Sequence, residues 1–323
     1  MEASATPLQF DASFESGNLA EARLIAEVPL EYDLHIRPDT LNTRHRVWFY
    51  FAVRGAARGQ KVIFNLIGYS KTKSLYRDGM APVVCTSSRP HWERMPESSV
   101  RLGLGLGLGL WLERQRGSVT QLITKWYTDG PSPLQVYYYK SPRHGKHYVL
   151  SFPFCFDRKD ARKEEVYYFA YCFPYTYSYL QRFLHSLDAA QLPCYRRECL
   201  CRTVQHRRLD LVTISSPANL ALDAAAKRHR GRRPPLPPEQ RRNLVFISSR
   251  VHPGESPASY LMHGLLLFLT SGHARAQALR EAVVVKLVPM PNPTPRSHPT
   301  PSPKPTPSPH QAPMPQPSPS PWP

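Results

Sequence analysis

The sequence predicts an α+β protein, in which an N-terminal antiparallel β-sandwich precedes an α/β domain and a disordered Pro-rich tail. Three observations support this fold class. Short aromatic segments that alternate polar and apolar residues recur as far as residue 171, as the strands of a sandwich do. A strand–helix–strand pattern follows at residues 243–288, and 16 of the 35 prolines lie in residues 289–323. We therefore expect a sandwich at residues 8–175, an α/β domain at residues 176–290 and a tail at residues 291–323.

The composition is that of a basic, mostly globular protein. Hydrophobic residues make up 41% of the 323 residues, enough for a core, and 42 Lys and Arg against 24 Asp and Glu give a net charge of +18. These values exclude an acidic disordered chain, and no apolar run reaches the ~20 residues that a membrane-spanning helix needs. A charge of this sign favours an anionic partner, such as nucleic acid, phospholipid or an acidic peptide.

The N-terminal half is expected to form strands, which are separated by turn residues. Their polar and apolar residues alternate at the period of a half-buried strand (residues 31–37, 46–53, 61–67, 136–139, 148–152 and 166–171). The aromatic side chains could stack on nucleotide bases, but their alternation with apolar neighbours favours packing in a core. The repeated Leu-Gly pairs from Leu102 to Leu110 have no such period, so residues 101–135 are interpreted as an unstructured, low-complexity insertion.

The second half begins with a helical pattern. Helical periodicity is expected from Tyr177 to Arg208, and four apolar residues share one face (Leu180, Phe183, Leu184 and Leu187). A strand follows at residues 209–215. We expect a helix packed against a sheet from this order.

A basic, Pro-rich loop is expected at residues 224–242. Between Lys227 and Arg242 there are seven Lys or Arg residues and one Glu. The segment Arg232–Pro238 has the spacing of an SH3-domain ligand. A solvated basic linker is the favoured interpretation, and the SH3 partner is kept as the alternative.

A βαβ unit is expected next. Residues 243–249 and 282–288 are apolar throughout, as buried parallel strands are. The helix between them should start with Ser256 as N-cap and Pro257 at the first helical position, and it should stop at Gly272. Its apolar face is assigned to three residues (Leu261, Leu265 and Phe268).

The loop between the first strand and the helix carries the candidate chemistry. Functional loops of such units lie at the carboxyl ends of the strands, where this sequence has His252 and Glu255. Three residues apart in a tight loop, they can offer an imidazole nitrogen and a carboxylate to one zinc ion, and a catalytic zinc needs three protein ligands. The spacing alone is weak, because a loop histidine beside a glutamate at a helix N-terminus gives the same pattern.

Several stretches resemble the cytosolic carboxypeptidases, which are zinc enzymes that remove glutamates from protein tails. The matching motifs lie in order along the chain (Phe10–Leu19, Ser70–Pro82, Phe173–Tyr177 and His252–Glu255). The resemblance covers about residues 8–100 and 136–290. It implies a family-specific β-sandwich followed by an α/β metallocarboxypeptidase domain, with His252 and Glu255 as ligands of one Zn²⁺.

The resemblance also implies partners and a location. The expected substrates are polyglutamylated tubulin or other acidic C-terminal tails, with no nucleic acid and no membrane as partner. The six cysteines form no Cys-x-x-Cys pair, and reduced thiols suit the cytosol. We therefore expect a cytoplasmic protein, for which association with microtubules, centrioles or basal bodies is an open alternative.

The sequence departs from the family after about residue 290. There the resemblance implies a third zinc ligand (a histidine), an Asn-Arg pair for the substrate carboxylate and a glutamate general base, but this sequence has a Pro/Ser/Thr tail. His298 and His310 have no surrounding periodicity to position them. We therefore expect an incomplete α/β domain without catalytic residues of its own, in an inactive, C-terminally truncated form. The alternative is a non-catalytic module that binds acidic tubulin tails.

Overall fold

The computed structural model describes residues 7–39, 44–95, 136–157, 164–228 and 242–293. The proposed insertion, the SH3-like segment and the Pro-rich tail from residue 294 onward lie outside these ranges. The chain divides into two compact units, and the second spans Pro174–Pro295.

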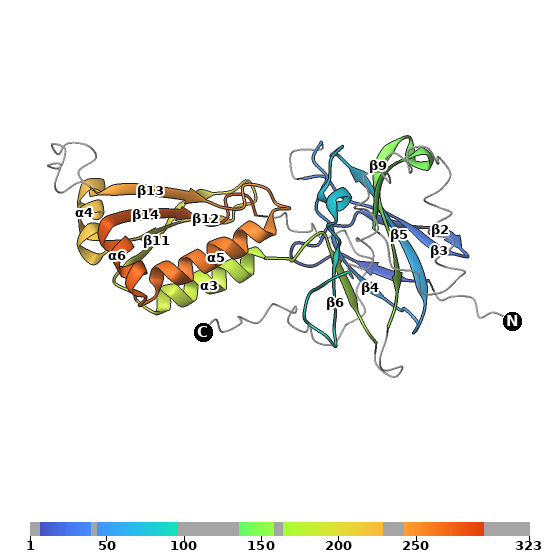
Figure 1. The fold of residues 1–323 in the computed structure, drawn as a ribbon, viewed down its shortest axis with the longest axis horizontal. Helices are drawn as coiled ribbons and strands as arrows, with labels where there is room; N and C mark the ends of the chain where they lie inside the picture. Colours follow the sequence, from blue (N-terminus) through green and yellow to red (C-terminus); the bar gives the residue numbers. More distant parts are fainter. Residues whose placement is uncertain (1–6, 40–43, 96–135, 158–163, 229–241, 294–323) are drawn as a thin grey trace. The chain divides into compact units, whose positions relative to one another are not determined.

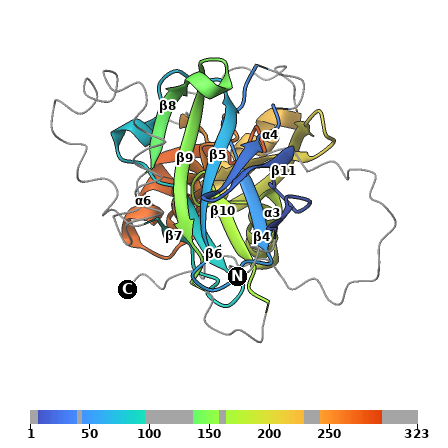
Figure 2. The ribbon, with the colours of Figure 1, turned by 90° about the vertical axis from the view of Figure 1, so that its right-hand side faces the viewer.

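The first unit consists of two five-stranded sheets, with the orders β1-β4-β10-β6-β7 and β2-β3-β5-β9-β8. Figure 2 shows β5, β9 and β8 side by side in the second of these. The strand bounds are β1 Gln9–Asp11, β2 Glu21–Glu27, β3 Leu30–His35, β4 Tyr50–Arg54, β5 Lys61–Tyr69, β6 Val83–Thr86, β7 Glu93–Arg94, β8 Tyr137–Ser141, β9 His147–Cys155 and β10 Tyr167–Ala170. The expected mixed fold with an N-terminal sandwich is confirmed, although β3 and β5 pair in parallel rather than antiparallel.

Aromatic side chains from both sheets form the core of the first unit. Phe64 of β5 lies against Phe51 of β4 and Phe169 of β10, with ring centroids 5.9 and 5.4 Å apart. All three side chains are fully buried. Edge-to-face contacts of this kind add to the stabilisation from burial, and they confirm that these aromatic residues pack in a core.

The second unit has one mixed sheet with the order β11-β12-β14-β13 (Figure 1). Its strands are β11 Tyr195–Arg202, β12 Arg208–Ile214, β13 Asn243–Ser248 and β14 Val283–Val288, and its helices are α3 Tyr177–Ala189, α4 Pro217–Arg228, α5 Ser256–Thr270 and α6 Ala274–Ala282. Helices α3 and α5 lie along one face of the sheet, where their apolar residues pack on Val212, Ile214 and Leu287. Strands β13 and β14 pair in parallel, which confirms the expected βαβ unit. None of the helices in the described ranges meets the length and apolarity needed to cross a membrane.

Three expectations for this unit are wrong. The helix does not extend to Arg208, because residues 195–202 form β11, whose register shifts between Cys199 and Cys201. Residues 224–228 belong to α4 rather than to a loop. Strand β13 is not buried: it is an edge strand in which Phe246 is 61% exposed.

The start and the buried face of α5 also differ from expectation. Glu255, not Ser256, occupies the N-cap position. The buried apolar residues are Met262, Leu266 and Leu269, whereas Leu261 is 77% exposed. The helix has apolar residues all round, and periodicity cannot choose a face in such a sequence.

Candidate metal centre

The loop between β13 and α5 presents the two predicted ligands together. His252 Nδ1 lies 2.7 Å from Glu255 Oε1, and the backbone N–H of Glu255 donates to the carbonyl oxygen of His252 at 2.8 Å. Both side chains are more than half exposed. The turn therefore places an imidazole and a carboxylate side by side at the carboxyl end of the sheet.

Arg250 belongs to the same loop, and its side chain is almost fully buried under it. Its Nε donates to the Pro253 carbonyl oxygen at 2.8 Å, and its Nη1 donates to Ser259 Oγ and to the Tyr175 carbonyl oxygen at 3.2 and 3.4 Å. Its backbone has a φ of 57°, a left-handed conformation that costs a non-glycine residue free energy. The hydrogen bonds of the guanidinium offset this cost, and they hold the loop, α5 and the segment before α3 together.

Ser249 fixes the start of the same loop. Its backbone N–H donates to the Val288 carbonyl oxygen at 3.1 Å, which extends the β13–β14 ladder. Its hydroxyl donates to the Ala258 carbonyl oxygen at 2.7 Å in the first turn of α5. The loop that carries His252 and Glu255 is thus attached to the adjacent strand and to the helix that follows.

The geometry of the pair fits two positions of a zinc site. Two ligand atoms at the usual zinc distances and a tetrahedral angle lie about 3.4 Å apart, and the observed 2.7 Å would need only a small adjustment. Among the residues that the structure describes, no group of three His, Cys, Asp or Glu side chains could hold a metal ion. His298 and His310 lie outside the described ranges. The described residues therefore supply two donors and do not complete a catalytic zinc site.

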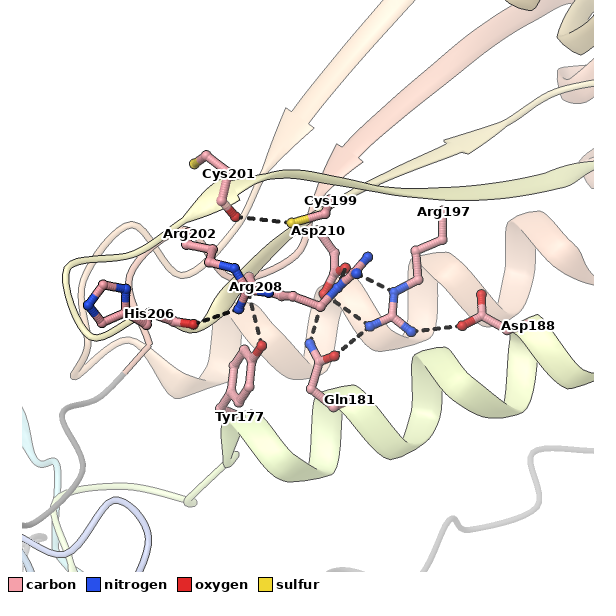
Figure 3. Close-up of polar contacts among 10 residues, drawn as sticks. All are labelled: Tyr177, Gln181, Asp188, Arg197, Cys199, Cys201, Arg202, His206, Arg208 and Asp210. Atoms are coloured by element: carbon pink, nitrogen blue, oxygen red, sulfur yellow. Dashed lines mark hydrogen bonds and ion pairs between the residues drawn. The ribbon is translucent and has the colours of Figure 1, made fainter.

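A second polar cluster, at the hairpin between β11 and β12, was not predicted from the sequence (Figure 3). The buried Asp210 carboxylate accepts hydrogen bonds from Arg197, from Gln181 of α3 and from Arg208, at distances of 2.8 to 3.1 Å. Arg197 also pairs with Asp188 of α3 at 2.8 Å. Arg196, Arg197 and Glu198 are consecutive polar residues, so no alternation in this segment indicated the first strand of the hairpin.

The charges in this cluster stabilise each other. Burial raises the pKa of the Asp210 carboxyl, but the hydrogen bonds from Arg197 and Gln181 outweigh this effect, so the pKa lies below its ordinary value of 3.8. Burial likewise opposes the charge of Arg197, yet its bonds to Asp210 raise its pKa. Asp210 is therefore a buried anion that fastens the hairpin to α3.

A third polar cluster lies in the first unit. His144 Nε2 is 2.9 Å from Asp33 Oδ2, and its Nδ1 is 2.8 Å from Ser141 Oγ. Asn65 donates to both Glu31 and Asp33. His144 is thus held by two polar partners. Ser141 is buried, which makes this arrangement structural rather than a nucleophile open to substrate.

Comparison with known proteins supports one family. The sequence profile for the cytosolic carboxypeptidase N-terminal domain matches residues 10–105. The chain is 44% identical to human cytosolic carboxypeptidase 6 over 286 residues, which cover 88% of this chain and 45% of the relative. The chain therefore spans about half the length of this relative.

Solved structures share the fold. A putative carboxypeptidase A from Shewanella denitrificans superposes with a TM-score of 0.57 at 20% identity, over 88% of this chain and 55% of the other. A metallo-carboxypeptidase from Pseudomonas aeruginosa, in complex with (2-guanidinoethylmercapto)succinic acid, superposes with a TM-score of 0.55 at 23% identity, over 88% and 56%. At these identities the likeness concerns the fold.

Proposed function

Because the chain belongs to the cytosolic carboxypeptidase family in the region that it shares with these relatives, we propose that it serves in removing glutamates from acidic protein tails. One observation carries the proposal: His252 and Glu255 lie 2.7 Å apart on a loop at the carboxyl end of the sheet. The net charge of +18 suits an acidic substrate, such as polyglutamylated tubulin. A cytoplasmic location, including microtubules, centrioles or basal bodies, belongs to the same proposal.

We assign His252 and Glu255 to one Zn²⁺. A bound zinc ion would supply Lewis-acid polarisation of a carbonyl and a water of lowered pKa. Arg250 and Ser249 hold the loop in place, so that the two donors need little reorganisation to bind the metal. The described residues supply no third ligand, and we therefore assign no hydrolytic step to them.

A non-catalytic role is the second candidate. It is favoured by the lack of a three-donor group in the described part of the chain. In this role the chain binds acidic tails and does not cleave them. An SH3-domain partner at Arg232–Pro238, and the lack of nucleic acid and membrane partners, stay predictions.

The test uses the purified chain with a polyglutamylated tubulin peptide. Free glutamate and bound zinc are measured with and without a chelator, for the parent, His252→Ala, Glu255→Ala and His185→Ala. His185 is an exposed histidine of α3 and serves as the matched control. We expect zinc binding to weaken in the first two variants only, and no glutamate release from the chain by itself.

Two other outcomes would contradict parts of this proposal. Glutamate release that His252→Ala and the chelator both abolish would show that residues outside the described ranges complete the site, and it would exclude the non-catalytic role. Zinc binding that is the same in all four proteins would contradict the assignment of the metal to this loop.

A further inference from the structure

The hairpin between β11 and β12 lies at the same edge of the sheet as the candidate metal loop. Strand β14 runs parallel to β13, β12 runs antiparallel to β14, and β11 runs antiparallel to β12. The carboxyl ends of β11, β13 and β14 therefore share one edge (Figure 1). The turn that links β11 to β12 is at this edge, together with His252 and Glu255.

The residues at the start of α3 contact both structures. The Tyr177 hydroxyl donates to the carbonyl oxygen of Arg208 in the hairpin at 3.0 Å. The Tyr175 carbonyl oxygen accepts from Arg250, the residue beneath the metal loop, at 3.4 Å. The hairpin and the loop are thus connected through residues two positions apart, and they form neighbouring parts of one surface.

The hairpin is basic, and its arginines are held in place. Residues 202–208 contain three arginines, one histidine and no acidic residue. Arg202 Nη1 donates to the His206 carbonyl oxygen at 3.0 Å, and the Arg207 guanidinium lies 5.7 Å from the Tyr177 ring centroid. The carboxylate of Asp210 pairs with Arg197 and Arg208, and no ion pair joins a described carboxylate to Arg202. A guanidinium has five N–H donors in a fixed fork, so that Arg202 keeps donors for an incoming carboxylate.

Asp210 holds the hairpin in place without neutralising Arg202 and Arg207. It is almost fully buried, at 2% side-chain exposure, and it pairs with Arg197 and Arg208. Its charge is therefore compensated by Arg197 and Arg208. Arginines that are positioned before binding lose less conformational entropy when they bind a ligand.

We propose that the hairpin, residues 202–208, is a binding site for the acidic residues that precede the chain end of a substrate tail. The assignment of direction rests on the proposed function, in which the chain end lies at His252 and Glu255. Two to three strand spacings separate the hairpin from the metal loop, which is roughly 10–14 Å. An extended peptide covers this distance with about three or four residues.

The length of the acidic tail should therefore matter. A peptide with only two glutamates reaches the loop alone, whereas one with eight can also contact the hairpin. Binding of fluorescently labelled diglutamate and octaglutamate peptides is measured by anisotropy, with a chelator present so that hydrolysis plays no part. The proteins are the parent, Arg202→Glu and Arg275→Glu.

Arg275 is the matched control because it is an exposed arginine of the same unit at the start of α6, which precedes the amino end of β14 and so lies toward the opposite edge. Arg202→Glu should weaken octaglutamate binding roughly fivefold or more, as reversal of one well-placed exposed charge does. Arg275→Glu should change it less than about twofold, and diglutamate binding should respond little to either. Helical circular dichroism checks that both variants are folded.

Three outcomes would overturn the inference: equal losses in the two variants, equal losses for the two peptides, or tighter Arg202-dependent binding of a single-stranded oligonucleotide of the same charge. Failure of the proposed function is distinguished by zinc binding. Arg202-dependent peptide binding, with zinc binding that His252→Ala and Glu255→Ala leave unchanged, supports the hairpin site and contradicts the assignment of the metal loop. Zinc binding that these two variants weaken, with Arg202-independent peptide binding, contradicts the hairpin site alone.

Discussion

Arg250 donates from its Nε to the carbonyl oxygen of Pro253 at 2.8 Å, so that a buried cation supports the loop in which His252 and Glu255 meet. The contact spans only three residues, yet the same guanidinium also contacts Tyr175 and Ser259. One side chain thus couples the metal loop to α5 and to the segment before α3.

We predict that Arg250→Met destabilises the second unit by about 2–4 kcal/mol, because it leaves buried carbonyl oxygens without their donor. It should also weaken zinc binding, although the two donor side chains are unchanged. The α-helices of the described ranges all belong to the second unit, so urea unfolding followed by helical circular dichroism reports on this unit. Arg275→Met is the control, and a loss below ~1 kcal/mol for Arg250→Met would contradict the role assigned to Arg250.

The buried Asp210 predicts how stability depends on pH. Its pKa in the folded protein lies below the ordinary 3.8, since burial is outweighed by the bonds from Arg197 and Gln181. A carboxyl whose pKa is lower in the folded than in the unfolded protein stabilises the fold at a pH above its unfolded pKa. This stabilisation is lost as the pH falls through its folded pKa. Asp210→Asn should therefore cost about 3–5 kcal/mol at neutral pH, and the difference from the parent should shrink below pH 3.8.

Asp188→Asn is the matched comparison for this prediction. Asp188 pairs with the same Arg197, but its side chain is 40% exposed. Its substitution should cost no more than ~1 kcal/mol. Equal losses for the two variants, measured by urea unfolding across the acidic range, would contradict the central role of Asp210.

Local patterns predicted the candidate metal loop and the βαβ unit around it. His252 and Glu255 are three residues apart between an apolar strand segment and a helix start, so the position of the loop, though not its metal ligation, follows from a short segment. The same holds for the alternating aromatic strands of the sandwich, such as β4 with Phe51. Where the contacts that determine an element are local, the sequence pattern was sufficient to predict the element.

Other features depend on contacts between distant residues. Strand β13 has the continuous apolar pattern of a buried strand, but burial also requires a neighbour on each side, and β13 pairs only with β14 among the described strands. Arg197 and Asp210 meet across a hairpin, and His144 meets Asp33 across 111 residues. No local period encodes such pairs, which explains why these clusters were missed.

The exposed edge strand β13 predicts self-association. Leu244 and Phe246 are 59% and 61% exposed on a strand with one unpaired edge in the described fold, and such edges favour pairing with another chain. Phe246→Lys should reduce concentration-dependent association in analytical ultracentrifugation and change the free energy of unfolding by less than ~0.5 kcal/mol. The control is Ala278→Lys, because Ala278 lies on the exposed surface of α6. Equal effects of the two lysines would show that added charge alone is responsible.

Asn65 Nδ2 donates to Glu31 Oε1 at 2.7 Å and to Asp33 Oδ1 at 3.0 Å. The amide is buried and lies between two buried carboxylates. In Asn65→Asp the bridging donor is lost and a third carboxylate is added. We expect a loss of about 3–5 kcal/mol in the stability of the first unit at neutral pH, because the buried negative charges are then less well compensated.

Asn65→Ala separates the two effects, since it removes the donor without adding charge. The carboxyl that Asn65→Asp introduces should have a raised pKa in the folded state, because burial and neighbouring carboxylates both disfavour its charge. A raised folded pKa favours proton uptake by the folded protein, so that Asn65→Asp should recover stability relative to Asn65→Ala as pH falls from about 7 to about 5. Urea unfolding can be followed by the fluorescence of the buried Trp48, which lies in the first unit. A constant difference between the two variants across this range would show that the lost donor, and not the added charge, determines the stability of this cluster.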